Sequence, residues 1–277
     1  MDWLTDHKLP LGKWIKSGVE WLLDNATWLF DAFAESMEFL IESFVSGMLW
    51  FHPLVMIAIF SGIAFALHRS WKLVALIVIS LLLVINLGYW EETLQTLGLV
   101  LFATLVSVVV GVPLGIAAAH RPWLYSILRP ILDLMQTIPT FVYLIPAIVF
   151  FGIGMVPGLI ATVIFVLPAP IRLTYLGVSS TPQQLLEAAR AFGATPNQVL
   201  YKVELPYALP QIMAGLNQTI MLSLSMVVIA GLVGADGLGV PVVRALSQVN
   251  AALGFESGLV IVVVAIMLDR MLRVERK

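Results

Sequence analysis

The sequence predicts an all-α polytopic membrane protein. Hydrophobic residues make up 60% of the 277 residues, whereas charged residues make up only 12%, about half of their share in soluble domains. The mean hydropathy is correspondingly high, at +0.98. Much of the chain also divides into apolar runs of about 20 residues, the length that an α-helix needs to cross a bilayer.

The first 48 residues predict an amphipathic helical segment rather than a membrane span. From residue 13 to residue 48, apolar side chains recur at steps of three or four, which predicts an apolar stripe on one long helix or two shorter ones. Acidic residues recur through the same stretch: Glu20, Asp24, Asp31, Glu35, Glu38 and Glu42. Nearby tryptophans, Trp14, Trp21 and Trp28, favour a helix that lies in the membrane interface or braces the outside of the bundle. A soluble helical hairpin packed on itself is the alternative.

Six or seven membrane spans are expected after this segment. Their predicted ranges are 49–67, 73–90, 93–119, 132–153, 158–178, 207–233 and 258–272. At about 1.5 Å of rise per residue, each range is long enough to cross about 30 Å of hydrocarbon.

Residues 181–206 form a polar island between two of these apolar stretches. The island holds Glu187, Arg190, Lys202 and Glu204, and charged groups of this density are not kept among lipid tails. We therefore expect the island to lie in water, as a loop between two spanning helices.

The island carries two helix-start signals separated by a glycine. Thr181, Pro182 and Gln184 match an N-cap, a proline at the first helical position and a capping-box partner. Gly193 stands where a helix ends in a left-handed residue. Thr195, Pro196 and Gln198 then repeat the start signal, so a second short helix is expected over 196–203, before Leu205 and Pro206 open the next element. The pattern predicts two short helices that meet at a sharp turn.

The spacing Glu187-Ala188-Ala189, Gly193, Val203, Leu205-Pro206 resembles the EAA loop of the membrane subunits of bacterial ATP-driven (ABC) importers, with Val203 where isoleucine is commoner. Further strings resemble, more narrowly, the type I permeases for glycine betaine, proline betaine and choline. They are QTIPTFVYL (136–144), FGIG (151–154), LP (167–168), IRLT (171–174), NQT (217–219) and LSMVV (224–228).

This resemblance, which covers roughly residues 94–270, implies a MetI-like core of five helices in residues 91–273. Residues 49–90 are then two accessory spans. It also implies a homodimer, two ABC ATPase subunits and an extracytoplasmic substrate-binding protein as partners, in the bacterial inner membrane. The residues expected to couple the permease to the ATPase are Glu187, Ala188, Ala189, Arg190, Phe192, Gly193, Leu205 and Pro206.

The distribution of basic residues agrees with a cytoplasmic position for this loop. With seven spans, the loop side receives eleven of the fifteen Lys and Arg residues: Arg69, Lys72, Arg121, Arg129, Arg172, Arg190, Lys202, Arg270, Arg273, Arg276 and Lys277. Lys8, Lys13, Lys16 and Arg244 fall on the other side. The positive-inside rule then places the N-terminus in the periplasm and the C-terminus in the cytoplasm.

Candidate residues for a translocation path come from the helix breakers and aromatic side chains. Prolines and glycines cluster between Ile138 and Pro170, and freed backbone groups are tolerated at membrane depth where protein or a wet cavity surrounds them. A methylated cation has no N–H to donate and binds to aromatic faces. The candidates are Phe141, Tyr143, Phe150, Phe165 and Tyr175, with Asn217, Gln218, Thr219, Ser223 and Ser225 as polar groups. Ordinary packing and contacts between helices are the alternatives.

Other functions are disfavoured by what the sequence lacks. It contains no G-x-x-x-x-G-K-[ST] phosphate loop, and no metal, cofactor or catalytic site is expected around His7, His52, His68 and His120. GADGLG (234–239) follows a span and is interpreted as an outer turn. A net charge of −2 argues against nucleic acid. Asp133 with Arg129, and Asp269 with Arg270, are expected near the inner interface, where they form ion pairs or contact lipid headgroups.

The leading hypothesis is therefore the permease subunit of an ATP-driven importer for a quaternary ammonium compatible solute, with ATPase activity in another chain. An importer for another small zwitterion, such as carnitine or histidine, is an alternative. An ion-coupled secondary transporter or channel is a second alternative, although acidic residues are not convincingly placed near the membrane midplane. A membrane scaffold is a third.

Overall fold

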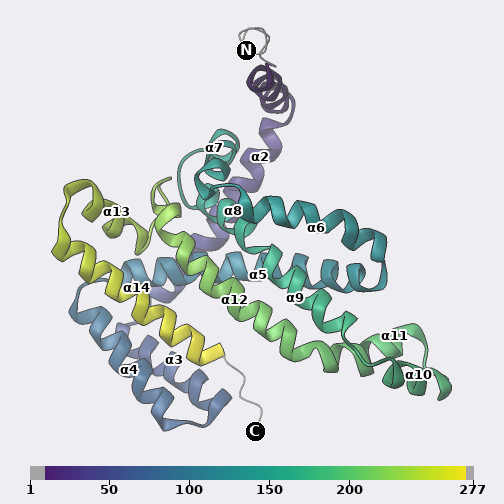
Figure 1. Ribbon diagram of the computed structural model, residues 1–277. Helices are drawn as coiled ribbons and strands as arrows, with labels where there is room; N and C mark the ends of the chain where they lie inside the picture. Colours follow the sequence, from purple (N-terminus) through teal and green to yellow (C-terminus); the bar gives the residue numbers. More distant parts are fainter. Residues whose placement is uncertain (1–9, 273–277) are drawn as a thin grey trace.

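The computed structural model describes residues 10–272, and every regular element within that range is a helix (Figure 1). The helices are α2 (Leu11–Leu49), α3 (Pro53–His68), α4 (Trp71–Asn86), α5 (Trp90–His120), α6 (Pro122–Thr137), α7 (Thr140–Phe151), α8 (Met155–Val166), α9 (Pro168–Ser179), α10 (Gln183–Ala191), α11 (Pro196–Val199), the π-helical turn η1 (Leu200–Glu204), α12 (Leu205–Gly231), α13 (Gly239–Gln248) and α14 (Ala251–Leu272).

Four helical stretches in the described range are long and apolar enough to cross a bilayer. They are Trp90–His120, Met155–Ser179, Pro196–Gly231 and Ala251–Leu272, and the number rises to six if two sharply bent helix pairs each count as one span. The α-helical fold with several spans is therefore confirmed, with fewer clear spans than expected.

The predicted boundaries of the first two spans are wrong. Leu49 belongs to α2, and α3 begins only at Pro53; Trp90 belongs to α5, because Gly88 takes a positive φ of 80° and separates it from α4. The helices α3 and α4 each have 16 residues, so at about 1.5 Å per residue each is about 24 Å long. That length is short of the hydrocarbon thickness.

The expected single span over 132–153 is also wrong, because the chain bends by 95° between α6 and α7. Ile138 is extended, with φ −66° and ψ 130°. A residue before proline is pushed out of the helical region by the proline ring, so Pro139 ends α6. Helix α6 begins earlier than expected, at Pro122.

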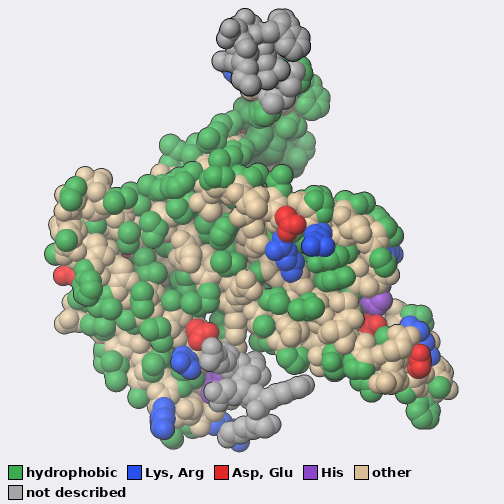
Figure 2. All heavy atoms as spheres, viewed as in Figure 1, with side chains coloured by type: hydrophobic (Ala, Val, Ile, Leu, Met, Phe, Trp, Pro, Cys, Tyr) green, Lys and Arg blue, Asp and Glu red, His purple; other side chains and the backbone are tan. Residues whose placement is uncertain are grey.

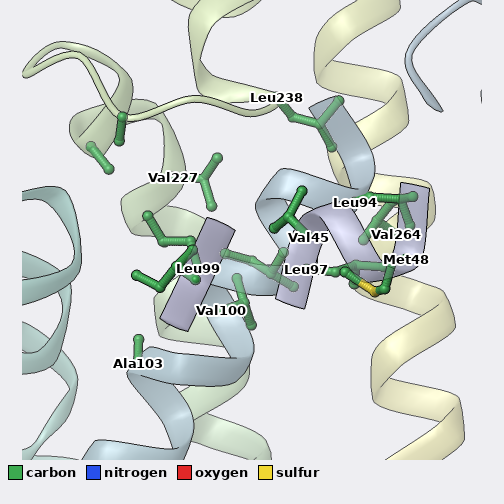
Figure 3. Packing of buried hydrophobic residues seen from close by; sticks show 14 of the residues in the cluster. Val45, Met48, Leu94, Leu97, Leu99, Val100, Ala103, Val227, Leu238 and Val264 are labelled. Carbon is green, nitrogen blue, oxygen red and sulfur yellow. The ribbon is translucent and has the colours of Figure 1, made fainter. Parts of the chain in front are cut away.

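The helix α5 lies at the centre of the core. Its residues Leu94, Leu97 and Leu99 are buried against α2, α12 and α14, which contribute Val45, Val227 and Val264 among others (Figure 3). Two glycines let α5 approach α9 closely: a Cβ on Gly111 would lie 2.8 Å from Pro170 Cγ, and one on Gly115 would lie 2.7 Å from the carbonyl oxygen of Ile171.

The N-terminal segment is one long helix rather than a hairpin. Near its C-terminal end, α2 buries Ile41, Val45 and Met48 in the core. Its N-terminal half extends away from the bundle, where Trp14, Trp21 and Trp28 are exposed (Figure 1). The buried face is displaced from the predicted apolar stripe, because the stripe residues Leu40 and Phe44 are exposed.

A short helix that the sequence did not predict, α13, lies between the turn at 234–238 and α14. Gly234 and Gly237 have positive φ values of 85° and 120°, which confirms a turn in this glycine-rich segment. The turn is fixed to α5 because the backbone N–H of Leu238 donates to Thr96 Oγ1 at 2.8 Å. Gly239 then packs directly on the backbone of α12, where an added Cβ would lie 2.1 Å from the Val227 oxygen.

Candidate functional site

The polar island folds into a short exposed helix, a reversal and a second helical turn, which we call the coupling elbow (residues 181–206). Figure 1 shows its helices α10 and α11 at the end of the bundle away from α13. Phe192, just after α10, is 92% exposed, and Leu185 and Tyr201 are also exposed. Large exposed apolar side chains gathered at one tip are typical of a surface that binds a partner.

The first helix-start signal is wrong in detail. Pro182 is extended, with φ −57° and ψ 132°, so α10 begins at Gln183 and makes no side-chain cap. Thr181 is buried, and its hydroxyl has no hydrogen-bond partner among the described residues. Thr181 is therefore one residue too far from the first turn to cap it.

The glycine turn and the second start signal are confirmed. Gly193 has a φ of 80°, its N–H donates to Arg190 O at 2.9 Å, and the N–H of Ala194 donates to Ala189 O at 3.1 Å. This pair of bonds is the Schellman arrangement at a helix C-terminus. Thr195 and Gln198 form the expected capping box, in which each side chain accepts a hydrogen bond from the other residue's N–H.

The second helix does not end at Val203 as expected. The chain stays helical from Pro196 to Gly231, passing through η1, where the N–H of Leu205 donates to Leu200 O. A π-helical turn is wider than an α-helical one, which leaves space for the ring of Pro206 and makes its missing N–H tolerable. Residues 196–204 of the elbow are thus helically continuous with α12.

A contact that the sequence analysis missed fixes the root of the elbow. Glu204 in η1 is 6% exposed, and its Oε2 lies 2.9 Å from Nε2 of His120, the last residue of α5. Nδ1 of His120 lies 2.9 Å from Ile116 O, which orients the ring. The two residues are 84 positions apart, and a charged residue in a polar loop gave no signal that it would be buried.

The path candidates lie on several elements rather than in one aromatic cage. Tyr143 is buried, and its hydroxyl donates to Met135 O. Phe165 packs against the hydrophobic cluster that contains Tyr143. Phe150 packs on Phe30 of α2 at 4.7 Å between ring centroids, while Phe141 is exposed.

The polar candidates of α12 mostly bond within their own helix. Thr219, Ser223 and Ser225 donate to backbone carbonyls four residues earlier, at 2.8, 2.8 and 3.1 Å respectively. Asn217 has a buried Oδ1 without a hydrogen-bond partner in the described range. Gln218 is exposed.

A cavity of about 390 Å³ opens at the other end of the molecule from the elbow. Four carboxylate residues line it, Glu38, Glu42, Glu91 and Asp236, which come from α2, α5 and the turn before α13. Negative charge is therefore concentrated at one end of the helical bundle.

A second polar group lies between α6 and α9. Arg172 donates to Asp133 Oδ1 at 2.6 Å and to Gln136 Oε1 at 2.8 Å. The predicted pairing of Asp133 with Arg129 is wrong. Asp133 pairs instead with Arg172 of the neighbouring helix α9. One turn after Arg172, Tyr175 stacks on Tyr125 with ring centroids 3.6 Å apart and the planes within 3° of parallel.

Residues 111–273 match the model of the family described as "Binding-protein-dependent transport system inner membrane component". The chain belongs to this family. It is therefore a multi-pass permease of the inner membrane, a subunit of an assembly with ATPase and binding-protein partners, and not itself an enzyme.

Relatives agree over nearly the whole chain. The glycine betaine transport system permease protein OpuAB of Bacillus subtilis (strain 168) is 47% identical over 264 residues, which cover 95% of this chain and 93% of the relative. The glycine betaine/proline betaine permease protein ProW of Escherichia coli (strain K12) is 43% identical and covers 96% of this chain and 75% of the relative. The predicted resemblance to this permease group is confirmed.

The fold agrees with a solved structure. The MetNI methionine ABC transporter in an inward-facing conformation matches with a TM-score of 0.57 and 26% identity, over 67% of this chain and 91% of that chain. The MetI-like type I architecture expected from the sequence is confirmed.

Proposed function

We propose that this permease imports glycine betaine, proline betaine or a closely similar quaternary ammonium solute, driven by ATP hydrolysis in a partner ATPase. The observation that carries the proposal is the coupling elbow, whose apolar tip at Phe192 is exposed while its root continues without a break into α12. The substrate class is inferred from the named activities of the relatives, whose identity of 43–47% extends over nearly the whole chain.

The mechanism follows from the connection between the elbow and the bundle. Closure of the ATPases moves α10, and Glu187, Ala188, Ala189, Arg190 and Phe192 are the contact residues that we assign to the ATPase. The Schellman turn at Gly193 transmits this motion to η1 and α12. Leu205 and Pro206 begin the helix that receives it. As a result of this motion, the translocation path opens toward the outside of the cell.

We further propose a homodimer oriented with the elbow in the cytoplasm. This orientation puts the acidic cavity of Glu38, Glu42, Glu91 and Asp236 on the periplasmic side, where a substrate-binding protein delivers its cargo. The N-terminus is then periplasmic and the C-terminus cytoplasmic. In the proposed division, residues 1–48 are a periplasmic or interfacial helix, 49–90 are accessory and 91–273 are the transporting core, which includes the path candidates Phe141, Tyr143, Phe150, Phe165, Asn217 and Ser225.

Reconstitution tests the function. Vesicles that contain this chain with its ATPase and binding protein are expected to accumulate radiolabelled glycine betaine only when ATP is supplied. Accumulation of solute by vesicles that contain the permease but not the ATPase, driven by an ion gradient alone, contradicts the proposal. Vesicles with every partner that show no flux of any quaternary amine contradict it as well.

A further inference from the structure

Both ring nitrogens of His120 lie next to oxygen atoms. Nδ1 is 2.9 Å from Ile116 O, and Nε2 is 2.9 Å from Oε2 of Glu204. Figure 2 shows a histidine and an acidic side chain side by side where the coupling elbow joins the bundle. A backbone carbonyl oxygen only accepts hydrogen bonds, so Nδ1 must carry a hydrogen for its contact with Ile116 O to be a hydrogen bond.

The two contacts together require one proton more than a neutral imidazole and a carboxylate hold. A neutral imidazole has a single N–H. With that hydrogen on Nδ1, the lone pair of Nε2 faces the carboxylate of Glu204; with the hydrogen on Nε2, the lone pair of Nδ1 faces Ile116 O. Both contacts are satisfied only by an imidazolium, or by a protonated Glu204 that donates to Nε2. Either arrangement holds the same additional proton, which therefore belongs to the pair.

No other charged group in the described range stabilises the carboxylate of Glu204. Glu204 is 6% exposed, and His120 is its one side-chain partner among the described residues. The elements that pack against the pair carry the titratable or charged residues Arg121, Tyr125, Arg129, Asp133, Arg172, Tyr175, Glu187, Arg190, Tyr201, Lys202 and Tyr207. Within the part of the chain that the structure describes, none of these residues forms an ion pair or a side-chain hydrogen bond with His120 or Glu204. Arg121, Arg190 and Lys202 are exposed, so solvent screens their charges.

We propose that His120 and Glu204 are positioning residues that fasten the coupling elbow to α5 only while the pair holds its additional proton. His120 is the last residue of α5, and Glu204 ends the π-helical turn η1. As the pH on the elbow side rises through the range of about 5 to 8, in which imidazoles ionise, the proton is lost, and one of the two contacts is lost with it. ATP hydrolysis is then coupled less efficiently to transport. This consequence for transport rests on the proposed function, whereas the proton dependence of the contact does not.

Two amide variants keep the contact but remove its need for a proton. In Glu204→Gln, a side-chain N–H can donate to Nε2 of a neutral His120, while Nδ1–H still donates to Ile116 O. In His120→Gln, the amide N–H donates to the carboxylate of Glu204. The matched control is His68→Gln. Nε2 of His68 lies 2.7 Å from Met271 O, and its Nδ1 has no hydrogen-bond partner in the described range, so a neutral imidazole is sufficient there.

Uptake and ATP hydrolysis by the complete transporter test the effect on coupling. The vesicles hold the ATPase, ATP and the elbow on the lumenal side, where alone the pH is varied, so the external binding protein stays at constant pH. In the wild type and His68→Gln, the number of glycine betaine molecules imported per ATP is expected to fall at least about twofold from about pH 6 to about pH 8. In Glu204→Gln and His120→Gln this ratio is expected to stay nearly constant. The same pH profile in the wild type and in Glu204→Gln overturns the proposal.

Thermal unfolding of the purified permease in detergent tests the contact itself, without partners or substrate. The melting temperature of the wild type relative to Glu204→Gln is expected to fall by about 2–4 °C between the same two pH values, because the folded wild type loses the proton that holds the contact. An unchanged difference refutes the proton-dependent contact. A shift in melting temperature without any pH dependence of the import ratio refutes the role in coupling. If the wild type imports no quaternary amine at any pH, the proposed function fails, and the unfolding measurement still decides on the contact.

Discussion

His120 and Glu204 join the last turn of α5 to the root of the coupling elbow. Nε2 of His120 lies 2.9 Å from Oε2 of Glu204, whose side chain is only 8% exposed. A spanning helix and the helix that leaves the elbow are therefore tied together at one polar contact. The tie gives α5 a direct mechanical connection to the proposed ATPase-binding surface.

Removing His120 tests this tie. In His120→Ala, Glu204 remains buried without its side-chain partner, so the free energy of unfolding should fall by about 1–3 kcal/mol. Thermal unfolding in detergent measures the change. Glu204→Gln retains a hydrogen-bonding group and should lose less, and Lys202→Ala, exposed in the same turn, should lose almost nothing. Equal stability of His120→Ala and the wild type contradicts a structural role for the contact.

Two threonines near the start of α5 provide a matched comparison. Thr96 and Thr93 are both fully buried, but Thr96 Oγ1 accepts from the N–H of Leu238 whereas Thr93 Oγ1 has no partner among the described residues. Thr96→Val should therefore lower the free energy of unfolding by about 1–3 kcal/mol, since a buried N–H loses its acceptor. Thr93→Val should be neutral or stabilising. Equal effects in the thermal unfolding of both variants contradict this assignment.

Because α5 approaches α9 closely at Gly115, a single added methyl group there is expected to lower the free energy of unfolding. A Cβ on Gly115 would lie 2.7 Å from both Ile171 O and Thr174 Cβ, and these backbone-anchored atoms cannot move aside alone. Gly115→Ala should lower the free energy of unfolding by about 1–3 kcal/mol. Gly62→Ala, at a helical site with open space around it, should leave the free energy unchanged or raise it. A normal melting temperature for Gly115→Ala contradicts the described packing.

The positive φ of Gly193 in the Schellman turn predicts which residues can replace it. Its φ of 80° is accessible to asparagine and disfavoured for β-branched residues. Gly193→Val should lower transport and the coupled ATP hydrolysis, while the isolated binding protein still binds substrate. Gly193→Asn should retain most of both activities. Full coupling in Gly193→Val shows that the turn does not transmit the motion.

Local signals in the sequence were sufficient where the structure depends on nearby residues. The positive φ of Gly193 and the capping box of Thr195 and Gln198 each involve residues within a few positions of one another. The helical continuity of α2 is likewise predicted by a local pattern, although the pattern did not show that Ile41 and Val45, rather than Leu40 and Phe44, are the buried residues.

Features that depend on distant contacts were missed. Asp133 pairs with Arg172, 39 positions away, and not with Arg129, because the rotation of α6 against α9 decides which face of α6 is covered. The burial of Glu204 likewise depends on the end of α5, 84 positions away. The break between α6 and α7, in contrast, follows from the local effect of Pro139, which the prediction of a single span did not take into account. The family motifs predicted the permease family, which is confirmed, but they carried no information on these contacts between helices.

Side-specific labelling tests the central claim, that the coupling elbow lies in the cytoplasm against an ATPase. Because the natural chain contains no cysteine, Phe192→Cys and Leu246→Cys each introduce a single thiol, at positions that are 92% and 75% exposed. With a membrane-impermeant maleimide, the account predicts that Phe192→Cys is labelled only in inside-out vesicles and is protected when the ATPase is bound. Leu246→Cys should be labelled only in right-side-out vesicles. Labelling of Phe192→Cys from the periplasmic side, or no protection by any nucleotide-hydrolysing partner, would contradict the account.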